Sequence, residues 1–580
     1  MNPPKKVIEQ IHQIFAKFFW GNVGDIKGKH WVAWKDLCFP KEERGIGFRS
    51  LHDINKVLFA KLWWNFRVST NSLWATYMWN KYCKKMHPVL VKSSGASHVW
   101  RKMISMREEV EHDIWWQLKA GNSSFWFDNW TRQGALFYTE GELAQEEELE
   151  VKEFIINGSW NVCKLQAVVS EEMVQHITTN IRANICEDST DKAWWIGDGK
   201  GIFTVKSAFQ NTRSRREENE WNKYMWVKGL PWKIRFFLWR VWRRRIATDD
   251  NLKRMKINVV SKCYCCEKGE LETMSHLFLT APIAQKLWKQ FATCVGININ
   301  GLNLQQLIYR WWERKISNKL DQILKAVPAI IMWELWKRRN AIRHGNETSY
   351  IWMYHQCQLT IHQLIRIKFP WIKRTTYHWP EMVNILQNYK PILHHLIVRW
   401  NLPREGWVVC NTDGVSKGNP GQSAYGFCIR NCDGDLIYAA AQEIGVTTNM
   451  KAEVRAIWEA LHFCKRKGFY QIQLETDSLM AKNMITKNWR IPWEIMEMIE
   501  DIHDIVIQLN VHVQHIFREA NQLADYIANT AINKEDKQEY HHFSHLPSLG
   551  KKILNIDKQQ IPTLRIKTMR IISNYNGQYA

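Results

Sequence analysis

The chain has 580 residues, a formal net charge of +23 and a pI near 9.4, and this length allows several domains at about 100–200 residues each. It contains no apolar run near the roughly 20 residues of a membrane span. Its start, Met1-Asn-Pro-Pro-Lys-Lys, is unlike a signal peptide, and its thirteen cysteines are scattered and odd in number. These features argue against a membrane-spanning or secreted disulfide-rich protein and predict a reducing compartment, the nucleus or the cytoplasm.

The positive charge is distributed unevenly along the chain. Residues 401–534 contain 13 Lys or Arg against 16 Asp or Glu, so this segment carries about −3 and the remainder about +26. A basic excess of this size predicts a polyanionic partner, most simply nucleic acid, with single-stranded RNA or DNA among the candidates, although a basic surface that only aids solubility is the alternative. The 33 tryptophans are compatible with stacking on bases, but core packing is the simpler expectation for most of them.

The first 400 residues predict mainly helices. Apolar residues recur with helical spacing over 7–20, and further helices are expected over 53–66, 232–245, 320–343 and 351–369. The stretch 121–130 predicts a turn followed by a short aromatic strand. Prolines at 380, 391 and 403 predict a linker before the next domain.

The pattern changes at residue 406, where short apolar runs alternate with amphipathic segments. Strands are expected over 407–412, 424–430, 436–445, 471–475 and 511–517, and helices over 450–467, 478–487, 493–508 and 519–531. The turn Asn431-Cys-Asp-Gly434 joins two of these strands as a hairpin. The alternation predicts an α/β domain with a mixed sheet, followed by a flexible basic tail over 535–580.

Four acidic residues of the α/β segment stand out by their settings. Asp413 and Asp477 end strand-like runs, and Glu453 and Asp525 lie on helix-like segments. Carboxylates that are brought together repel one another, and Mg²⁺, which prefers oxygen ligands, relieves that repulsion. Two Mg²⁺ ions about 3.5–4 Å apart are a known device for attack on phosphodiesters. For each acid alone, a surface carboxylate or a helix cap is the alternative, most seriously for Asp477. Four other acids lack such a setting and are expected to be solvated, namely Asp433, Asp435, Glu459 and Glu475.

Short motifs in this region carry a family resemblance. They are Thr412-Asp413-Gly414, Gly418-Asn-Pro-Gly421, Ala452-Glu453, Thr476-Asp477-Ser478 and Ala524-Asp525. In this order they resemble a type 1 ribonuclease H domain in its plant retroelement form. Residues 40–48, 124–130 and 203–209 resemble the C-terminal region of plant non-LTR (LINE-type) retrotransposon reverse transcriptases. About residues 203–288 look like the zinc-binding domain of those elements.

The resemblance implies a fold, a reaction and a set of site residues. The implied fold is a five-stranded mixed sheet with helices, and the implied reaction is Mg²⁺-dependent hydrolysis of the RNA strand in an RNA–DNA hybrid. Asp413, Glu453, Asp477 and Asp525 would hold two Mg²⁺ ions, and His515 would assist proton transfer or product departure. Substrate contacts are implied for Gly414, Asn419, Asn449 and Ser478. His515 as a strand-end residue without a role, and Asn419 and Asn449 as plain turn and cap residues, are the alternatives.

A candidate zinc site lies upstream. Cys263 and Cys266 have the CxxC spacing of tetrahedral zinc sites, and His276 follows. The related domains usually close with a cysteine where this chain has Ala281. Cys265 or a water would have to serve as fourth ligand, and a degenerate finger held by packing alone is the alternative.

The resemblance divides the chain into six parts. Residues 1–115 are expected to be a reverse transcriptase thumb- or connection-like remnant, 116–200 an aromatic-rich connecting region, 201–300 the zinc-binding-like domain, 301–400 a helical region and linker, 401–534 the ribonuclease H domain, and 535–580 the tail. No Tyr-x-Asp-Asp sequence occurs, so we expect a retroelement-derived protein without the polymerase core.

Three functions compete at this stage. The first is an active hybrid ribonuclease whose basic upstream region, especially Arg235, Arg240 and residues 243–245, grips phosphates. The second is a catalytically inactive, nucleic-acid-binding remnant of a retrotransposon. The third is a domesticated interaction protein that uses its tryptophan-rich helices.

Overall fold

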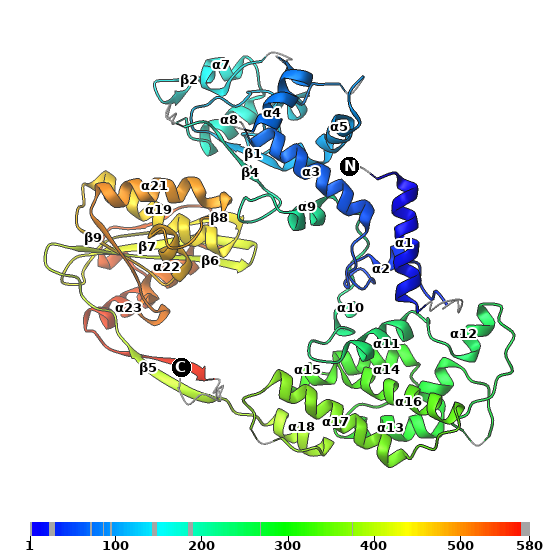
Figure 1. Ribbon diagram of the computed structural model, residues 1–580. Coiled ribbons are helices and arrows are strands. Elements are labelled where there is room, and N and C mark those ends of the chain that lie inside the picture. Colours follow the sequence, from blue (N-terminus) through cyan, green and yellow to red (C-terminus); the bar gives the residue numbers. More distant parts are fainter. Residues whose placement is uncertain are drawn as a thin grey trace. The chain divides into compact units, whose positions relative to one another are not determined.

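The computed structural model describes residues 3–21, 29–69, 72–84, 86–92, 95–141, 148–183, 189–266, 268–373 and 375–569. The chain forms two compact units (Figure 1). The helical unit comprises Met1–Ile54, Arg213–Leu393 and Thr568–Ala580, and the α/β unit comprises Asn55–Thr212 and His394–Lys567. None of the helices within the described residues combines the length and the apolar character that a membrane crossing requires.

The helical unit is built from helices that share one apolar core. They are α1 (Lys5–Phe19), α2 (Trp34–Leu37), α10 (Trp221–Tyr224), α11 (Trp232–Trp242), α12 (Asp249–Arg254), α13 (Pro282–Thr293), α14 (Leu304–Glu313), α15 (Leu320–Leu324), α16 (Val327–Arg343), α17 (Tyr350–Lys368) and α18 (Trp379–Gln387). Trp239, Trp288, Trp311 and Trp379 are fully buried in this core. Core packing therefore accounts for these tryptophans, as the sequence predicts.

The structure differs from the linker predicted over 371–404. Helix α18 occupies part of it, because Pro380 falls in the first turn of the helix, where no backbone N–H is required. Strand β5 (Ile392–Val398) follows and pairs with strand β12 (Thr563–Met569) near the C-terminus. Proline spacing alone does not distinguish a helix start from a break.

The first half of the α/β unit combines helices with short strands. Its elements are α3 (Leu51–Val68), α4 (Leu73–Met78), α5 (His98–Val110), β1 (Ile114–Gln117), α6 (Leu136–Thr139), β2 (Ile155–Ile156), β3 (Ser159–Trp160), α7 (Val162–Gln166), α8 (Glu171–Asn180), β4 (Lys192–Trp195) and α9 (Val205–Thr212). Phe125, Trp126 and Phe127 lie in turns and are all buried. The aromatic strand predicted there is wrong, because a strand would send neighbouring side chains to opposite faces.

The second half of the α/β unit contains a mixed six-stranded sheet in the order β10-β9-β6-β7-β8-β11. The strands are β6 (Val408–Gly418), β7 (Gly421–Arg430), β8 (Leu436–Thr447), β9 (Ile472–Thr476), β10 (Val511–His515) and β11 (Gln538–Tyr540), and the helices are α19 (Asn449–Lys467), α20 (Leu479–Ile485), α21 (Met496–Gln508), α22 (Gln522–Ala531) and α23 (Ser548–Lys558). Helices α19 and α21 cover one face and α22 and α23 the other (Figure 1). The predicted fold class is confirmed, with one strand more than expected.

The additional strand comes from the segment predicted to be a flexible tail. Within 535–569 the chain forms β11, which pairs with β8, and α23, which packs on the sheet through Ile553 and Leu554. Asp557 of α23 is buried and accepts a hydrogen bond from Arg430 at 2.8 Å. A buried ion pair and an apolar helix face fix this segment, although its composition is polar and basic.

Candidate active site and candidate zinc site

The sheet register brings the first two acids together. Strands β6 and β9 are parallel neighbours, and Thr412 is the register partner of Thr476. Asp413 and Asp477 each follow these threonines, so their side chains lie at the same level of adjacent strands. The sequence separates them by 64 positions, and only the parallel pairing makes them neighbours.

Glycine at position 414 allows the third acid to approach. A Cβ on Gly414 would lie 2.1 Å from the backbone nitrogen of Glu453, so only glycine fits where α19 crosses β6. The Gly414 N–H donates to Glu453 Oε2 at 3.2 Å. This contact fixes the Glu453 carboxylate beside the strand that carries Asp413.

Carboxylate oxygens of Asp413, Glu453 and Asp477 all lie within 4.8 Å of one another. Burial, together with the charges of Glu453, Asp477 and Asp525, raises the pKa of Asp413 to about 10. Burial and the Asp477 charge raise the pKa of Glu453 to about 8. Burial also raises the pKa of Asp477, and its Oδ1 is buried without a hydrogen-bond partner among the described residues. Without a cation this cluster retains protons, which is the property of a site built for cations.

Asp525 lies beside this trio but has a different partner. Its Oδ1 accepts a hydrogen bond from Arg518 Nη2 at 2.6 Å and a weaker one from Asn529 at 3.3 Å. Arg518 lies in a short helical turn before α22, and its charge lowers the pKa of Glu453 and of Asp477. The sequence analysis did not single out Arg518. A usable signal was its position seven residues before Asp525, directly before a predicted helix.

The other predicted site residues are placed as follows. His515 ends β10, and its Nε2 lies 3.1 Å from the backbone oxygen of Asp477. Asn419 Oδ1 accepts from the Asn449 N–H at 3.1 Å, and Asn449 Nδ2 donates to Glu453 Oε1 at 3.4 Å. Ser478 is the N-cap of α20 and accepts from the Ala481 N–H at 3.3 Å. Ser478, and not Asp477, therefore caps α20, whereas Asn449 contacts Glu453 and Asn419 contacts the Asn449 backbone.

One acid that was expected to be solvated is buried. Glu475 is 2% exposed, next to Thr476 on β9. It accepts hydrogen bonds from Trp400 at 2.9 Å, Asn411 at 2.7 Å and Gln473 at 2.8 Å. The expectation was wrong because the donors come from positions up to 75 residues away, which the local sequence does not reveal.

The candidate zinc ligands also converge. Cys263 Sγ, Cys266 Sγ and a His276 ring nitrogen lie within 4.8 Å of one another. His276 Nδ1 lies 3.0 Å from Glu270 Oε2, and Nε2 is buried without a partner among the described residues. A carboxylate that holds one ring nitrogen while the other is free is the usual arrangement of a zinc-binding histidine. These residues therefore fit a zinc ion, with three protein ligands and Ala281 at the expected fourth position.

A mixed sheet with helices on both faces and acids that converge beside two parallel central strands defines the ribonuclease H-like class of α/β domain. Comparison with models of known protein families leads to the same class. Residues 411–531 match the model described as reverse transcriptase-like, and residues 203–288 match the model described as zinc-binding in reverse transcriptase. These matches confirm the retroelement resemblance of both segments.

Two relatives, compared by sequence, support the same assignment. A "Putative ribonuclease H protein" of Arabidopsis thaliana is 24% identical, over 96% of this chain and 89% of that protein. The ribonuclease H of Dichelobacter nodosus is 30% identical, over 21% of this chain and 88% of that protein. Among solved structures, RNase H1 of Halobacterium salinarum is 29% identical, with a TM-score of 0.21, over 22% of this chain and 96% of that chain. The chain belongs to the ribonuclease H family through its α/β domain.

Proposed function

We propose that this protein hydrolyses the RNA strand of RNA–DNA hybrids by a two-metal mechanism. The observation that carries the proposal is the convergence of Asp413, Glu453 and Asp477 within 4.8 Å, in a buried cluster with raised carboxyl pKa values. A purely structural cluster of three unpaired acids would destabilise the fold without compensation. Family membership supports the reaction class.

The chain's own residues would have distinct roles. Asp413, Glu453, Asp477 and Asp525 would hold two Mg²⁺ ions, which when bound orient a water against the phosphate and stabilise the departing 3′-oxygen. His515 Nε2 faces a backbone carbonyl oxygen, which only accepts, so this nitrogen carries the hydrogen. Nδ1 is then the ring atom that is free to take up and release a proton.

Asn419 and Asn449 are suited to the RNA strand. Both carry amides that donate and accept; Asn449 contacts Glu453, and Asn419 contacts the Asn449 backbone. Hydrogen bonds to the 2′-hydroxyl distinguish RNA from DNA. We assign these two residues, with Gly414, to substrate contact, and Ser478 to the positioning of Asp477 through its helix cap.

The zinc-binding segment has a structural role in this proposal. Cys263, Cys266 and His276 would hold zinc, with Glu270 fixing the histidine ring. Three protein ligands leave the fourth position to Cys265 or to a water.

The second candidate is a nucleic-acid-binding protein that no longer cleaves. A 5′-labelled RNA–DNA hybrid incubated with Mg²⁺ and either the native chain or Asp413→Asn separates the two. The proposal expects cleavage of the RNA strand by the native chain alone, because the amide removes one metal-ligand charge. Equal, background-level cleavage by both proteins, with hybrid binding retained, would establish the inactive alternative.

A further inference from the structure

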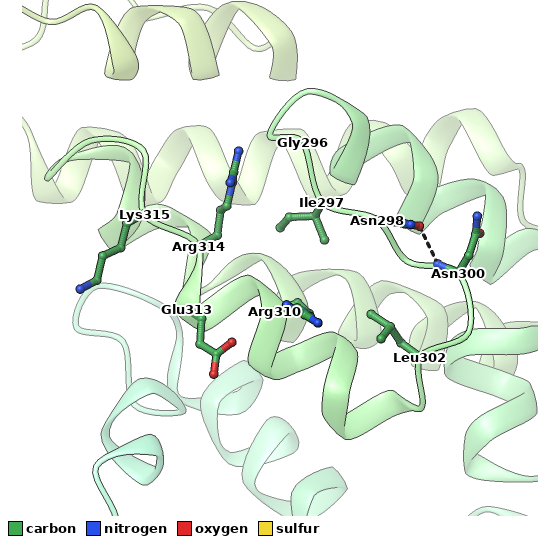
Figure 2. Close-up of a pocket in the computed structure, with 9 residues that line it drawn as sticks. All are labelled: Gly296, Ile297, Asn298, Asn300, Leu302, Arg310, Glu313, Arg314 and Lys315. Carbon is green, nitrogen blue, oxygen red and sulfur yellow. Dashed lines mark hydrogen bonds between the residues drawn. The ribbon is translucent and has the colours of Figure 1, made fainter.

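Three adjoining hollows lie on the surface of the helical unit. They have volumes of about 440, 450 and 530 Å³. The first and second share Trp221 and Tyr309, and the second and third share Leu302, Arg310 and Glu313, so the hollows form one continuous groove. Figure 2 shows the third hollow, between the loop Gly296–Leu302 and the side chains at the end of α14.

The groove is strongly cationic. Six positive side chains line it, namely Arg44, Arg243, Arg245, Arg310, Arg314 and Lys315, against the single carboxylate of Glu313. None of these six forms an ion pair with any carboxylate that the structure describes. Elsewhere in the unit arginines do have such partners, as in Arg339 with Glu272. The cations of the groove are therefore available to an external anion.

The charges in the groove repel one another. Burial lowers the pKa of Arg243, and the positive charges of Arg216, Arg245 and Arg44 lower it further, against a raising effect of Asp36. The backbone that presents Arg44 is fixed, because its carbonyl oxygen accepts from Trp239 Nε1 at 3.1 Å and from Arg243 Nη1 at 3.0 Å. The groove therefore combines positive side chains that lack a carboxylate partner with a fixed backbone. This combination is more typical of a binding site than of a basic surface that only aids solubility.

Aromatic rings line the same groove. Trp221, Trp242 and Tyr309 are half-buried. The Tyr309 ring is perpendicular to both indoles, at 5.0 Å from Trp221 and 5.2 Å from Trp242, and Trp312 is buried beneath them. Mutual packing therefore holds these rings in place at the groove wall. An acidic peptide would use the cations but would leave the aromatic faces without planar partners.

Not all arginines predicted to grip phosphates belong to this groove. Arg243 and Arg245 line it. Arg240 is half-buried, with its guanidinium 5.1 Å from the ring of Trp31, and burial lowers its pKa to about 10. Arg240 thus stabilises the packing of α11, and the accessible charge lies at the end of that helix and along α14.

We infer that this groove binds single-stranded nucleic acid, with phosphates on its arginines and bases stacked on Trp221, Trp242 and Tyr309. Cationic grooves with stacking aromatics are the general solution for single strands. The inference is independent of hybrid cleavage, because every residue of the groove belongs to the helical unit.

The test measures binding of fluorescein-labelled single-stranded RNA and DNA of about 12 nucleotides, a length within the usual range for such sites, by anisotropy over a series of salt concentrations. The full chain carries Asp413→Asn throughout, so that no substrate is cleaved. The groove variant adds Arg245→Gln, Arg310→Gln and Lys315→Gln. The control variant adds Lys253→Gln, Arg254→Gln and Lys289→Gln, which remove the same charge from exposed positions of the helical unit outside the groove.

The two variants are expected to differ in salt dependence as well as affinity. Each lost phosphate contact lowers the slope of log K against log salt by about 0.7 for a single strand, so the groove variant should lose about 2. The control variant should keep its slope. Trp242→Leu should weaken binding about fivefold or more and leave the slope unchanged, because stacking releases no counterions.

Three results would overturn the inference. They are equal slopes for the groove and control variants, full affinity after Trp242→Leu, and binding confined to the duplex hybrid. Circular dichroism spectra that match the parent chain would establish that the variants are folded. Similar losses with RNA and DNA are expected, because backbone contacts and stacking do not read the sugar.

Discussion

Replacement of Asp413 by asparagine should stabilise the metal-free protein while it abolishes cleavage. Asp413 has its pKa raised from 3.8 to about 10 by burial and by the neighbouring acids. The folded chain therefore holds a proton that the unfolded chain releases above about pH 4. Each pH unit above that value costs about 1.36 kcal/mol of folding free energy, so the cost at pH 7 approaches about 4 kcal/mol. Asparagine has nearly the same shape and requires no proton.

The size of this effect depends on pH and on Mg²⁺, and this dependence is what the test measures. The gain from Asp413→Asn should be small at pH 4, where the carboxyl is protonated in the folded state and still about half protonated in the unfolded state, and should grow as the pH rises toward 8. Bound Mg²⁺ should stabilise the native chain by about 2.7 kcal/mol at one hundred times its dissociation constant. The variant should gain less from Mg²⁺, so that the two proteins approach each other in stability.

Thermal unfolding of the full chain, followed by near-ultraviolet circular dichroism with and without Mg²⁺ at pH 4 to 8, measures these differences. At about 2–4 °C per kcal/mol, a gain of about 4 kcal/mol should raise the unfolding midpoint of the α/β unit by about 8–16 °C at pH 7 without metal. Asp504→Asn, an exposed position on α21, is the control and should show no such rise. A metal-free variant that is less stable than the native chain at pH 7, or a gain that does not vary with pH, would refute the reasoning.

Three further predictions concern neighbouring features. Arg518→Gln removes a charge that lowers the pKa of Glu453 and Asp477, so the acid limb of the pH–rate profile should move to higher pH, and Arg518→Lys should restore it in part. Gly414→Ala places a Cβ 2.1 Å from the Glu453 backbone and should lower the free energy of unfolding, measured in urea, by about 1–3 kcal/mol or more. The control Gly199→Ala places a Cβ with nothing within 4 Å and should have little effect. Glu270→Gln should weaken zinc binding about 10–100-fold in a competition with a chelating dye, because it loosens the His276 ring; unchanged zinc affinity would contradict this role for Glu270.

The sequence predicts the α/β domain well because its signals there are local. The turn before Asp435, the glycine that closes α19 and the alternation of apolar runs each determine one element. The setting of Asp477 directly after a strand was also a local signal, whereas the prediction that Asp413 ends its strand is wrong, because pairing with β7 extends β6 to Gly418. Their proximity depends on parallel pairing of β6 with β9, which the residues themselves do not specify and which the family resemblance supplied.

The features that escaped prediction depend on long-range partners. Helix α23 is held by a pair between Asp557 and Arg430, 127 positions apart. The groove of the helical unit combines Arg44 with residues from α11 and α14 that lie about 200 positions or more away in sequence. Composition gave the charge of these segments correctly, but only tertiary packing determines whether a basic stretch is a tail, a packed helix or the wall of a groove.

Glu475 and Asp413 show how buried acids of one small domain can be assigned different roles. Both lie on central strands and are almost fully buried. Glu475 is surrounded by N–H donors from Trp400, Asn411, Gln473 and Gln514, so its charge is satisfied within the fold. Asp413 is instead surrounded by other carboxyls, and the Asp477 oxygen beside it has no donor among the described residues. A buried charge requires compensation. A buried acid that accepts hydrogen bonds from donors within the fold therefore has a structural role, whereas a buried acid that lacks such donors is suited to binding a cation.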